Sequence, residues 1–94
     1  MQVIFRPEAE QEIFEAQDWY ESCSPGLGYE FARAVEVAVE LAIRMPLAHP
    51  QIEDEYRHVI LRRFPYSIIF LPCVSGILIV SCFHHKRKPL SWLK

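Results

Sequence analysis

The first part of the chain carries apolar residues at helical spacing. Between about Pro7 and Tyr20, apolar positions recur three or four residues apart, at Ala9, Ile13, Ala16 and Tyr20. This spacing places them on one side of a helix. Proline is favoured in a first helical turn, and the acids that follow it, Glu8 and Glu10, complement the positive end of the helix dipole. We therefore predict a helix from about Pro7 to Tyr20.

A second helix is predicted from about Leu27 to Met45, after the break at Ser24-Pro25-Gly26. Its apolar positions form one stripe: Leu27, Phe31, Ala34, Val35, Ala38, Leu41, Ala42 and Met45. Such a stripe is typical of a helix face that packs against a core. Because the connection between the two helices is short, we expect an antiparallel helix hairpin.

The remaining segments favour β-structure or loop. Val3 to Phe5 is a short β-prone run, and Pro46 to Glu55 is predicted to be a loop. Beyond it, β-branched and aromatic residues are separated by turn residues, with Pro72 to Gly76 as one turn. Short connections predict an antiparallel meander of three strands, which are Tyr56 to Arg62, Tyr66 to Leu71, and Ile77 to about His84.

These elements predict an α+β fold: an N-terminal strand, an antiparallel helix hairpin and a three-stranded antiparallel meander, with both helices on one face of the sheet. The length of 94 residues predicts a single domain over residues 1–94. The helices and strands are expected to share one core, which contains Ile13, Phe31, Val35, Leu41, Ile69 and Ile79.

One uncharged segment is long enough to span a membrane. Phe64 to Phe83 is twenty residues without a charge, close to the length of a membrane-spanning helix. However, Pro65, Pro72 and Gly76 interrupt it, and its two β-rich runs are separated by a turn. A hairpin with one buried face explains the segment better than a membrane span does.

Acidic and basic residues are separated along the chain. Residues 1–55 contain all twelve acids and three bases, whereas residues 56–94 contain seven bases and no acid. The two parts therefore carry −9 and +7, which sum to −2. Bases without local acids favour a polyanion or an acidic peptide as a partner. Attraction between the two parts of the same chain explains the asymmetry equally well.

The cysteines indicate a cytoplasmic protein. Cys23, Cys73 and Cys82 are odd in number and have no C-x-x-C spacing, which favours reduced thiols over a disulfide framework. No signal peptide is expected, because Arg6 and Glu8 interrupt the N-terminus before any apolar region forms.

No metal or cofactor is expected. Cys82 and His84 share one face of the last predicted strand, but two ligands are too few for a structural zinc site. The acidic run Glu53-Asp54-Glu55 is interpreted as a solvated turn, because a calcium site would need further oxygen ligands. The glycines form no phosphate-binding loop, and no serine lies in a nucleophile-elbow sequence.

The densest polar cluster follows the last strand, at His84-His85-Lys86-Arg87-Lys88. Alternation along a strand places His84 and His85 on opposite faces, so only one of them can face a given site. A histidine can act in acid–base catalysis near neutral pH, but this part of the chain has no carboxylate to orient it. Bases interleaved with aromatic residues also suit nucleic acid. The residues alone thus indicate a binding module for an anionic partner.

Several local patterns resemble the RelE/ParE superfamily of bacterial toxins. The start of the first helix, Phe5-Arg6-Pro7-Glu8-Ala9-Glu10-Gln11-Glu12-Ile13, is similar to the strand-to-helix start of that family, and Trp19-Tyr20 closes the helix. Met45-Pro46, Tyr56-Arg57 and the run from Phe64 to Phe70 also fit. His84, Arg87, Pro89 and Trp92 resemble the H-x-x-R-x-P-x-x-W ending of ParE-like members. The resemblance covers nearly the whole chain and implies the fold described above.

The resemblance favours the ParE-like branch over the RelE-like branch. RelE-like members cut messenger RNA on the ribosome and commonly carry an arginine on the middle strand of the meander, where this chain has Ser67. They also tend to have a basic or polar loop where this chain has Glu53-Asp54-Glu55. The ending with His84, Arg87 and Pro89 suits the ParE-like branch, whose studied members poison DNA gyrase without enzymatic activity. Lys88 departs from that branch, in which an acid is frequent.

The resemblance therefore implies a toxin of a type II toxin–antitoxin module, of the kind that stabilises plasmids, with DNA gyrase as its target. Its partner would be a ParD-like antitoxin with an acidic C-terminal segment. The residues expected to bind target or antitoxin are Arg57, Arg62, Arg63, His84, Lys86, Arg87 and Trp92. Two alternatives stay open: a ribosome-dependent mRNA endonuclease that uses Arg62, Arg63 and His85, and a non-toxic protein-binding module.

Overall fold

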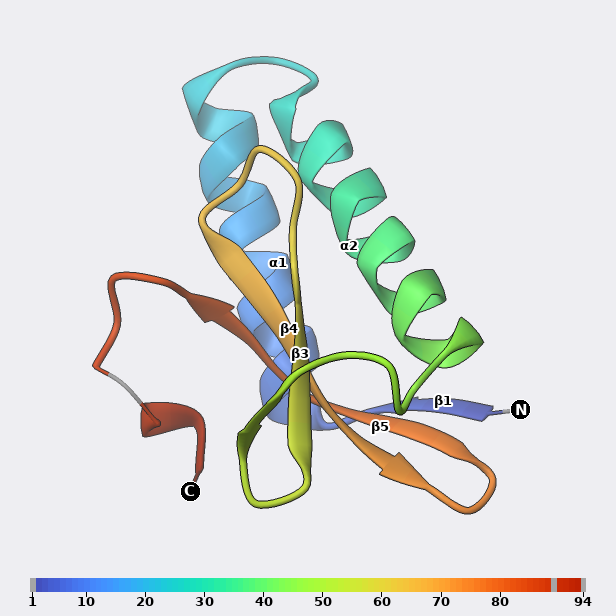
Figure 1. The fold of residues 1–94 in the computed structure, drawn as a ribbon. Helices are drawn as coiled ribbons and strands as arrows, with labels where there is room; N and C mark the ends of the chain where they lie inside the picture. The colour runs from blue at the N-terminus through green and yellow to red at the C-terminus, as the bar shows by residue number, and fades with distance from the viewer. Residues whose placement is uncertain (1, 89, 94) are drawn as a thin grey trace.

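The structure, a computed structural model, describes residues 2–88 and 90–93. Along the chain, its elements are β1 (Gln2–Phe5), α1 (Pro7–Cys23), α2 (Leu27–Arg44), β2 (Gln51–Glu53), β3 (Tyr56–Ile60), β4 (Tyr66–Cys73), β5 (Gly76–His84) and the short 3-10 helix η1 (Ser91–Leu93). Figure 1 shows the two helices as a hairpin against the sheet. The predicted α+β order of an N-terminal strand, a helix hairpin and an antiparallel meander is confirmed.

The strands form one sheet in the order β1-β5-β4-β3-β2. The meander β3-β4-β5 is antiparallel, while β1 joins β5 as a parallel strand, from Gln2 opposite Gly76 to Phe5 opposite Ile79. Gly76 permits this close approach, because a Cβ atom at this position would collide with the backbone of Gln2. β1 thus extends the meander as a further strand, although no tight turn joins it to β5.

The helix hairpin depends on a carboxylate at the turn. The Glu21 side chain, near the end of α1, accepts hydrogen bonds from the backbone N–H groups of Gly26 (3.1 Å) and Gly28 (3.0 Å). These N–H groups lie at the start of α2, where a helix leaves its first donors unpaired. Gly26 has a φ of 90°, which favours glycine. The break predicted at Ser24-Pro25-Gly26 is therefore confirmed.

Both helices cover the same face of the sheet, with α1 over β5 and α2 over β3 and β4. Residues between these layers form the main core, of which Phe31, Phe70 and Ile79 are fully buried. Tyr20 stacks on Phe31, with ring centroids 5.3 Å apart, and ties α1 to α2. The main core therefore lies between the helix hairpin and the strands, as predicted.

A second, smaller cluster lies on the opposite face of the sheet and includes Ile69, Val80 and Trp92. Ile69 was expected to share the core of Phe31, and this prediction is wrong. Side chains alternate along β4, so Ile68 and Phe70 face the helices and Ile69 faces the other way. The uncharged hairpin is thus buried on both faces. No helix among the described residues is long and apolar enough to cross a membrane.

The apolar stripe of α2 is wider than the surface that covers it. Leu41 and Met45, which were expected in the core, are 42% and 60% exposed. They lie on the flank of α2, whereas Val35, Ala38 and Ala42 lie at the centre of its buried face. The prediction that Leu41 belongs to the core is therefore wrong.

The segment from Pro46 to Glu55 is not entirely loop. It contains the short strand β2, which pairs with β3 through Gln51 opposite Arg57 and Glu53 opposite Tyr56. A strand of only three residues is too short to show the alternation of apolar and polar positions, which explains why the sequence did not indicate it. The pairing leaves the later part of β3 without a neighbour on its outer side.

The two cores predict independent stability effects. Phe31→Ala and Ile69→Ala should each lower the free energy of unfolding by about 2–5 kcal/mol, because both side chains are buried and leave cavities. Since they lie on opposite faces of the sheet, the double variant should be additive within about 0.5 kcal/mol. Urea unfolding measures all three variants. Leu41→Ala, at a half-exposed position, is the control and should cost less than about 1 kcal/mol. A large coupling between Phe31 and Ile69 would contradict the two-core description.

Candidate functional site

The bases expected to bind a partner occupy different parts of the surface. The Arg57 guanidinium lies against the loop before β2, where Nη1 donates to the carbonyl oxygens of Leu47 (3.2 Å) and His49 (2.6 Å). The half-buried Arg57 side chain thus holds this loop in place. Arg62 and Arg63 lie in the β3–β4 connection, away from the bases that follow β5.

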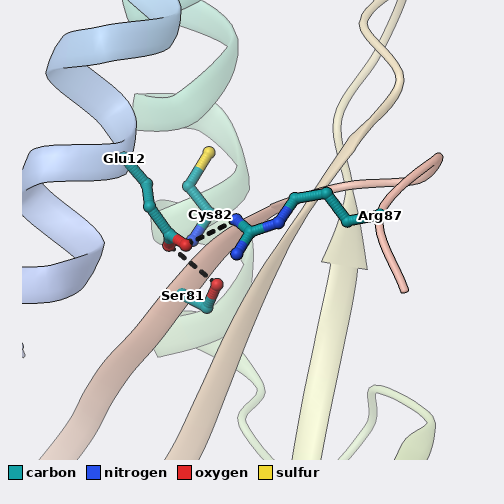
Figure 2. Close-up of polar contacts among 4 residues, drawn as sticks. All are labelled: Glu12, Ser81, Cys82 and Arg87. Carbon is teal, nitrogen blue, oxygen red and sulfur yellow. Dashed lines mark hydrogen bonds and ion pairs between the residues drawn. The ribbon is translucent and has the colours of Figure 1, made fainter. Parts of the chain in front are cut away.

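The end of β5 is built around a carboxylate of α1, Glu12 (Figure 2). Its Oε1 accepts hydrogen bonds from the Ser81 hydroxyl (2.8 Å) and from the backbone N–H of Cys82 (2.9 Å). Its Oε2 accepts from Nη1 of Arg87 at 2.7 Å. The Arg87 guanidinium also lies over the Phe83 ring, 5.5 Å from its centroid, a cation–π geometry. Arg87 is therefore fixed from two sides.

This arrangement closes a sheet edge. β1 ends at Phe5, opposite Ile79, so among the described residues no strand lies on this side of the later part of β5, which pairs with β4 on its other side. The Glu12 carboxylate takes the place of a strand at Cys82, whose N–H would otherwise be unpaired. From the sequence, Glu12 could be assigned only to the start of a helix, because its partners are 69, 70 and 75 residues away along the chain.

The two histidines at the end of β5, His84 within the strand and His85 directly after it, face opposite sides of the sheet, as predicted. The His84 ring contacts Tyr66 on the helix side, with centroids 4.8 Å apart, and its Nδ1 accepts the backbone N–H of Lys86. His85 lies on the other side, where its Nε2 is 2.8 Å from the Ser67 hydroxyl. A third histidine, His58, lies on β3. Burial, together with the nearby charges of His85 and His49, lowers its pKa.

Trp92 packs inside the protein. Its side chain is 7% exposed and meets the Tyr56 ring edge-on, with centroids 4.9 Å apart. It thereby covers the second cluster beside Ile69 and Val80. In this conformation, Trp92 stabilises the fold and offers little surface to a partner. Pro89, which belongs to the same sequence pattern, lies outside the described residues.

A groove of about 490 Å³ lies between α2 and the β3–β4 connection. We call it the α2–β3 groove. Buried Ala38 and Leu61 line its base. Phe64 is also buried, whereas four further lining residues are substantially exposed: Tyr29 (67%), Val37 (42%), Leu41 (42%) and Ile60 (59%). These exposed side chains lie around one groove, where a bound partner would cover them.

Arginines predominate at the rim of the α2–β3 groove. Its charged lining residues are Arg33, Arg62, Arg63 and Glu30, three positive charges against one negative. Arg63 contacts Glu30 at 3.3 Å, and Arg33 contacts Glu36 at 2.9 Å. Within residues 2–88 and 90–93, the Arg62 side chain has no ion pair or hydrogen bond. Of the three arginines at the rim, Arg62 therefore has the charge that is most available to a partner.

Arg62 and Arg63 were predicted from the sequence as binding residues, but the rest of this groove was not. The apolar stripe from Leu27 to Met45 contains Leu41, which lines the α2–β3 groove instead of the core. Which surface Leu41 meets depends on the placement of β3, which the helix pattern does not contain.

The structure does not bring together the residues expected for a nuclease. Arg62 and Arg63 line the α2–β3 groove, and Arg63 contacts Glu30 of α2. His85 contacts Ser67 on the opposite face of the sheet. None of the described hydrogen bonds or ion pairs joins either arginine to His85.

The cysteines and acids of the described residues form no metal centre. No group of three or more His, Cys, Asp or Glu among them could hold a metal ion. Burial, with a smaller contribution from Glu12, raises the pKa of Cys82 to about 12, which keeps this thiol protonated at neutral pH. Cys23 and Cys73 are exposed free thiols.

Comparison with solved structures identifies the fold. The chain resembles a chain described as "Chromosomal ParDE TA system from P. aeruginosa", with a TM-score of 0.64 and 19% sequence identity. The match covers 89% of this chain and 95% of that chain. No protein-family model and no curated protein matches the sequence. The predicted RelE/ParE-like fold, and the resemblance to ParE-like toxins at the level of the fold, are thus confirmed.

The contacts of Glu12 generate a stability prediction. Glu12→Ala should lower the free energy of unfolding by about 1–3 kcal/mol, because it leaves the Cys82 N–H and Arg87 without their acceptor. Glu15→Ala on the same helix is the matched control. Glu15 is exposed and accepts one bond from Gln11, so its loss should stay within about 0.5 kcal/mol. Urea unfolding decides the matter, and equal losses for the two variants would contradict a special role for Glu12.

Proposed function

We propose that this chain is the toxin component of a type II toxin–antitoxin module. A cognate antitoxin holds it inactive, and the free chain inhibits DNA gyrase. The observation that carries the proposal is the RelE/ParE-like fold together with the α2–β3 groove, an exposed apolar surface rimmed by arginines. A toxin neutralised by a protein partner needs a surface of this kind.

The chemistry of the groove favours an acidic antitoxin segment with large apolar side chains. Apolar anchors would cover Val37, Leu41 and Ile60, which are substantially exposed. Carboxylates would lie near Arg62 and Arg63 at the rim. Charges at the rim of an interface mainly raise the association rate, while buried apolar anchors provide most of the affinity.

The residues on the outer face of the sheet favour gyrase over messenger RNA as the target. Ser67 occupies the position where RelE-like toxins commonly carry an arginine, and its hydroxyl contacts His85. Without a guanidinium to stabilise a transferring phosphate, cleavage would lose several kcal/mol of transition-state stabilisation. Arg62 and Arg63 could supply this charge only by leaving the α2–β3 groove.

A ribosome-dependent endonuclease is the second candidate. The observation that favours it is the cluster of Ser67, His85 and His58 on the outer face of the sheet. A histidine with an exposed ring and a hydroxyl partner is suited to proton transfer. The two candidates differ in whether His85 is needed.

Expression of the chain alone in bacteria tests the proposal. We expect growth arrest with relaxed or cleaved DNA and intact messages, and we expect His85→Ala to remain toxic, because no proton transfer depends on it. DNA topology and message integrity are measured after induction. Messages cleaved within their codons, together with loss of toxicity in a folded His85→Ala variant, would instead identify the chain as a ribosome-dependent endonuclease. No phenotype at all would favour a non-toxic binding module.

The rate of association with the antitoxin tests whether the arginines at the rim of the α2–β3 groove attract it. The partner to be tested is the product of a small neighbouring gene that encodes a DNA-binding protein, where such a gene is found. Its association should slow as salt rises above roughly 0.15 M, where the screening length is about 8 Å. Arg62→Glu should slow it further, whereas Lys88→Glu, the same charge change outside the groove, should have a smaller effect. Stopped-flow mixing measures the rates. A rate that does not depend on salt, or a basic binding segment in the partner, would refute this role of the arginines.

A further inference from the structure

A second hollow lies where α1, α2 and the end of β1 meet. It has a volume of about 230 Å³, and apolar side chains of all three elements line it, among them Phe5, Ile13, Phe14 and Val35. We call it the α1–α2 hollow. Pockets for small molecules usually have volumes of about 300–1,000 Å³. This hollow therefore suits a single large side chain better than a whole ligand.

Phe14 is the most exposed apolar residue of this lining. Its side chain is 63% exposed, whereas Val35 is buried and Ile13 is half-buried. A single exposed apolar side chain is common on protein surfaces. Phe14 differs because it adjoins a hollow, so a partner that fills the hollow would also cover the ring. Removing this apolar area from water favours binding.

The charges beside the hollow are negative. The charged residues of its described lining are Glu10 and Glu36. Glu36 contacts Arg33 at 2.9 Å. Within the part of the chain that the structure describes, the Glu10 side chain has no ion pair or hydrogen bond. Glu10 is therefore an available negative charge beside an apolar hollow.

The outer side of α1 extends this acidic surface. Side chains four residues apart lie on one side of a helix, which places Glu10, Phe14 and Asp18 in one row. All three are exposed. The helix from Pro7 to Cys23 contains six acids and no lysine or arginine. No cation of α1 itself therefore neutralises the row beside the hollow.

The α1–α2 hollow is separate from the α2–β3 groove. Among the described residues, the two share no lining residue, because Val35 and Glu36 line the hollow while Val37 and Leu41 line the groove. Their charges are also opposite, since arginines predominate at the groove and carboxylates at the hollow. An acidic segment that suits the groove is repelled at the hollow, so the two surfaces suit different partners.

We propose that the α1–α2 hollow binds a basic segment of another protein. A large apolar side chain of that segment enters the hollow beside Phe14, and its lysines or arginines lie beside Glu10 and Asp18. Charge complementarity selects this partner, and the buried apolar side chain provides most of the affinity. The inference goes beyond the proposed function and does not depend on whether the chain is toxic.

A second copy of this chain fits the hollow less well. Its exposed Ile60 is followed by Arg62 and Arg63, which supply an apolar side chain and two charges of the right sign. Such a contact would join two different surfaces of the chain. Contacts of this kind leave a free surface at each end and extend into open chains of copies unless the rotation closes a ring.

The test uses three short synthetic peptides and the full chain. The first peptide carries one leucine between lysines and arginines, the second has glutamate in place of each base, and the third has serine in place of the leucine. Fluorescence anisotropy measures binding, and NMR chemical shifts locate it. We expect the first peptide to bind most tightly and to bind more weakly as salt rises. It should shift the signals of Phe14 and Glu36 but not those of Ile60.

Substitutions at exposed positions test the two parts of the contact. Glu10→Lys should weaken binding of the first peptide about fivefold or more, because it removes an attraction and adds a repulsion. Glu55→Lys makes the same charge change in the turn before β3 and should have a smaller effect. Phe14→Ser should weaken binding about tenfold, whereas Val74→Ser, at an exposed position in the β4–β5 turn, should not. Circular dichroism checks that all four variants fold.

Four results would overturn the inference: no binding of the first peptide, equal affinity for any two of the three peptides, no shift at Phe14 with bound peptide, or equal binding by Glu10→Lys and Glu55→Lys. Sedimentation of the chain alone at high concentration tests the other occupant. Self-association that Glu10→Lys abolishes would identify a second copy in the hollow and would also overturn the inference.

Discussion

The need to cover both faces of β4 and β5 shapes the whole structure. Side chains of β4 alternate between the helix side, where Ile68 and Phe70 are buried, and the outer side, where Ile69 is buried. The helix hairpin covers the first face, except at the α2–β3 groove. The second face is covered by a smaller set of residues, among which Trp92 comes from the end of the chain. The chain must therefore turn after β5 and return across the sheet, and that turn brings Arg87 to Glu12.

The contact between Glu12 and Arg87 connects the two parts of the charge pattern. Glu12 belongs to the acidic part of the chain and Arg87 to the basic part, as do Glu30 and Arg63 in the second such pair. Attraction within the chain thus explains part of the asymmetry. It does not explain all of it, because Arg62 has no such partner among the described residues.

The edges of the sheet are covered in different ways. At β5, a carboxylate from α1 occupies the place of a neighbouring strand, which blocks pairing with other chains. At β3, the neighbouring strand β2 is short, and Ile60 is left exposed beside an apolar groove. Among the described residues, the edge beside Cys82 is therefore closed to an added strand, whereas the outer side of β3 at Ile60 is not.

The sequence by itself determined the element order and the type of each long element. Helix period, strand alternation and the break at Gly26 act over a few residues, so they are visible without the fold. Alternation also placed His84 and His85 on opposite faces, and the local patterns of the ParE-like toxins indicated the fold that the structure has. Only the tertiary structure decided which core Ile69 joins and whether Leu41 is covered. It also decided what Glu12 binds, because these outcomes depend on contacts between residues far apart in the chain. A local pattern shows that a side chain is apolar or charged, but the surface it meets is set by how distant elements pack.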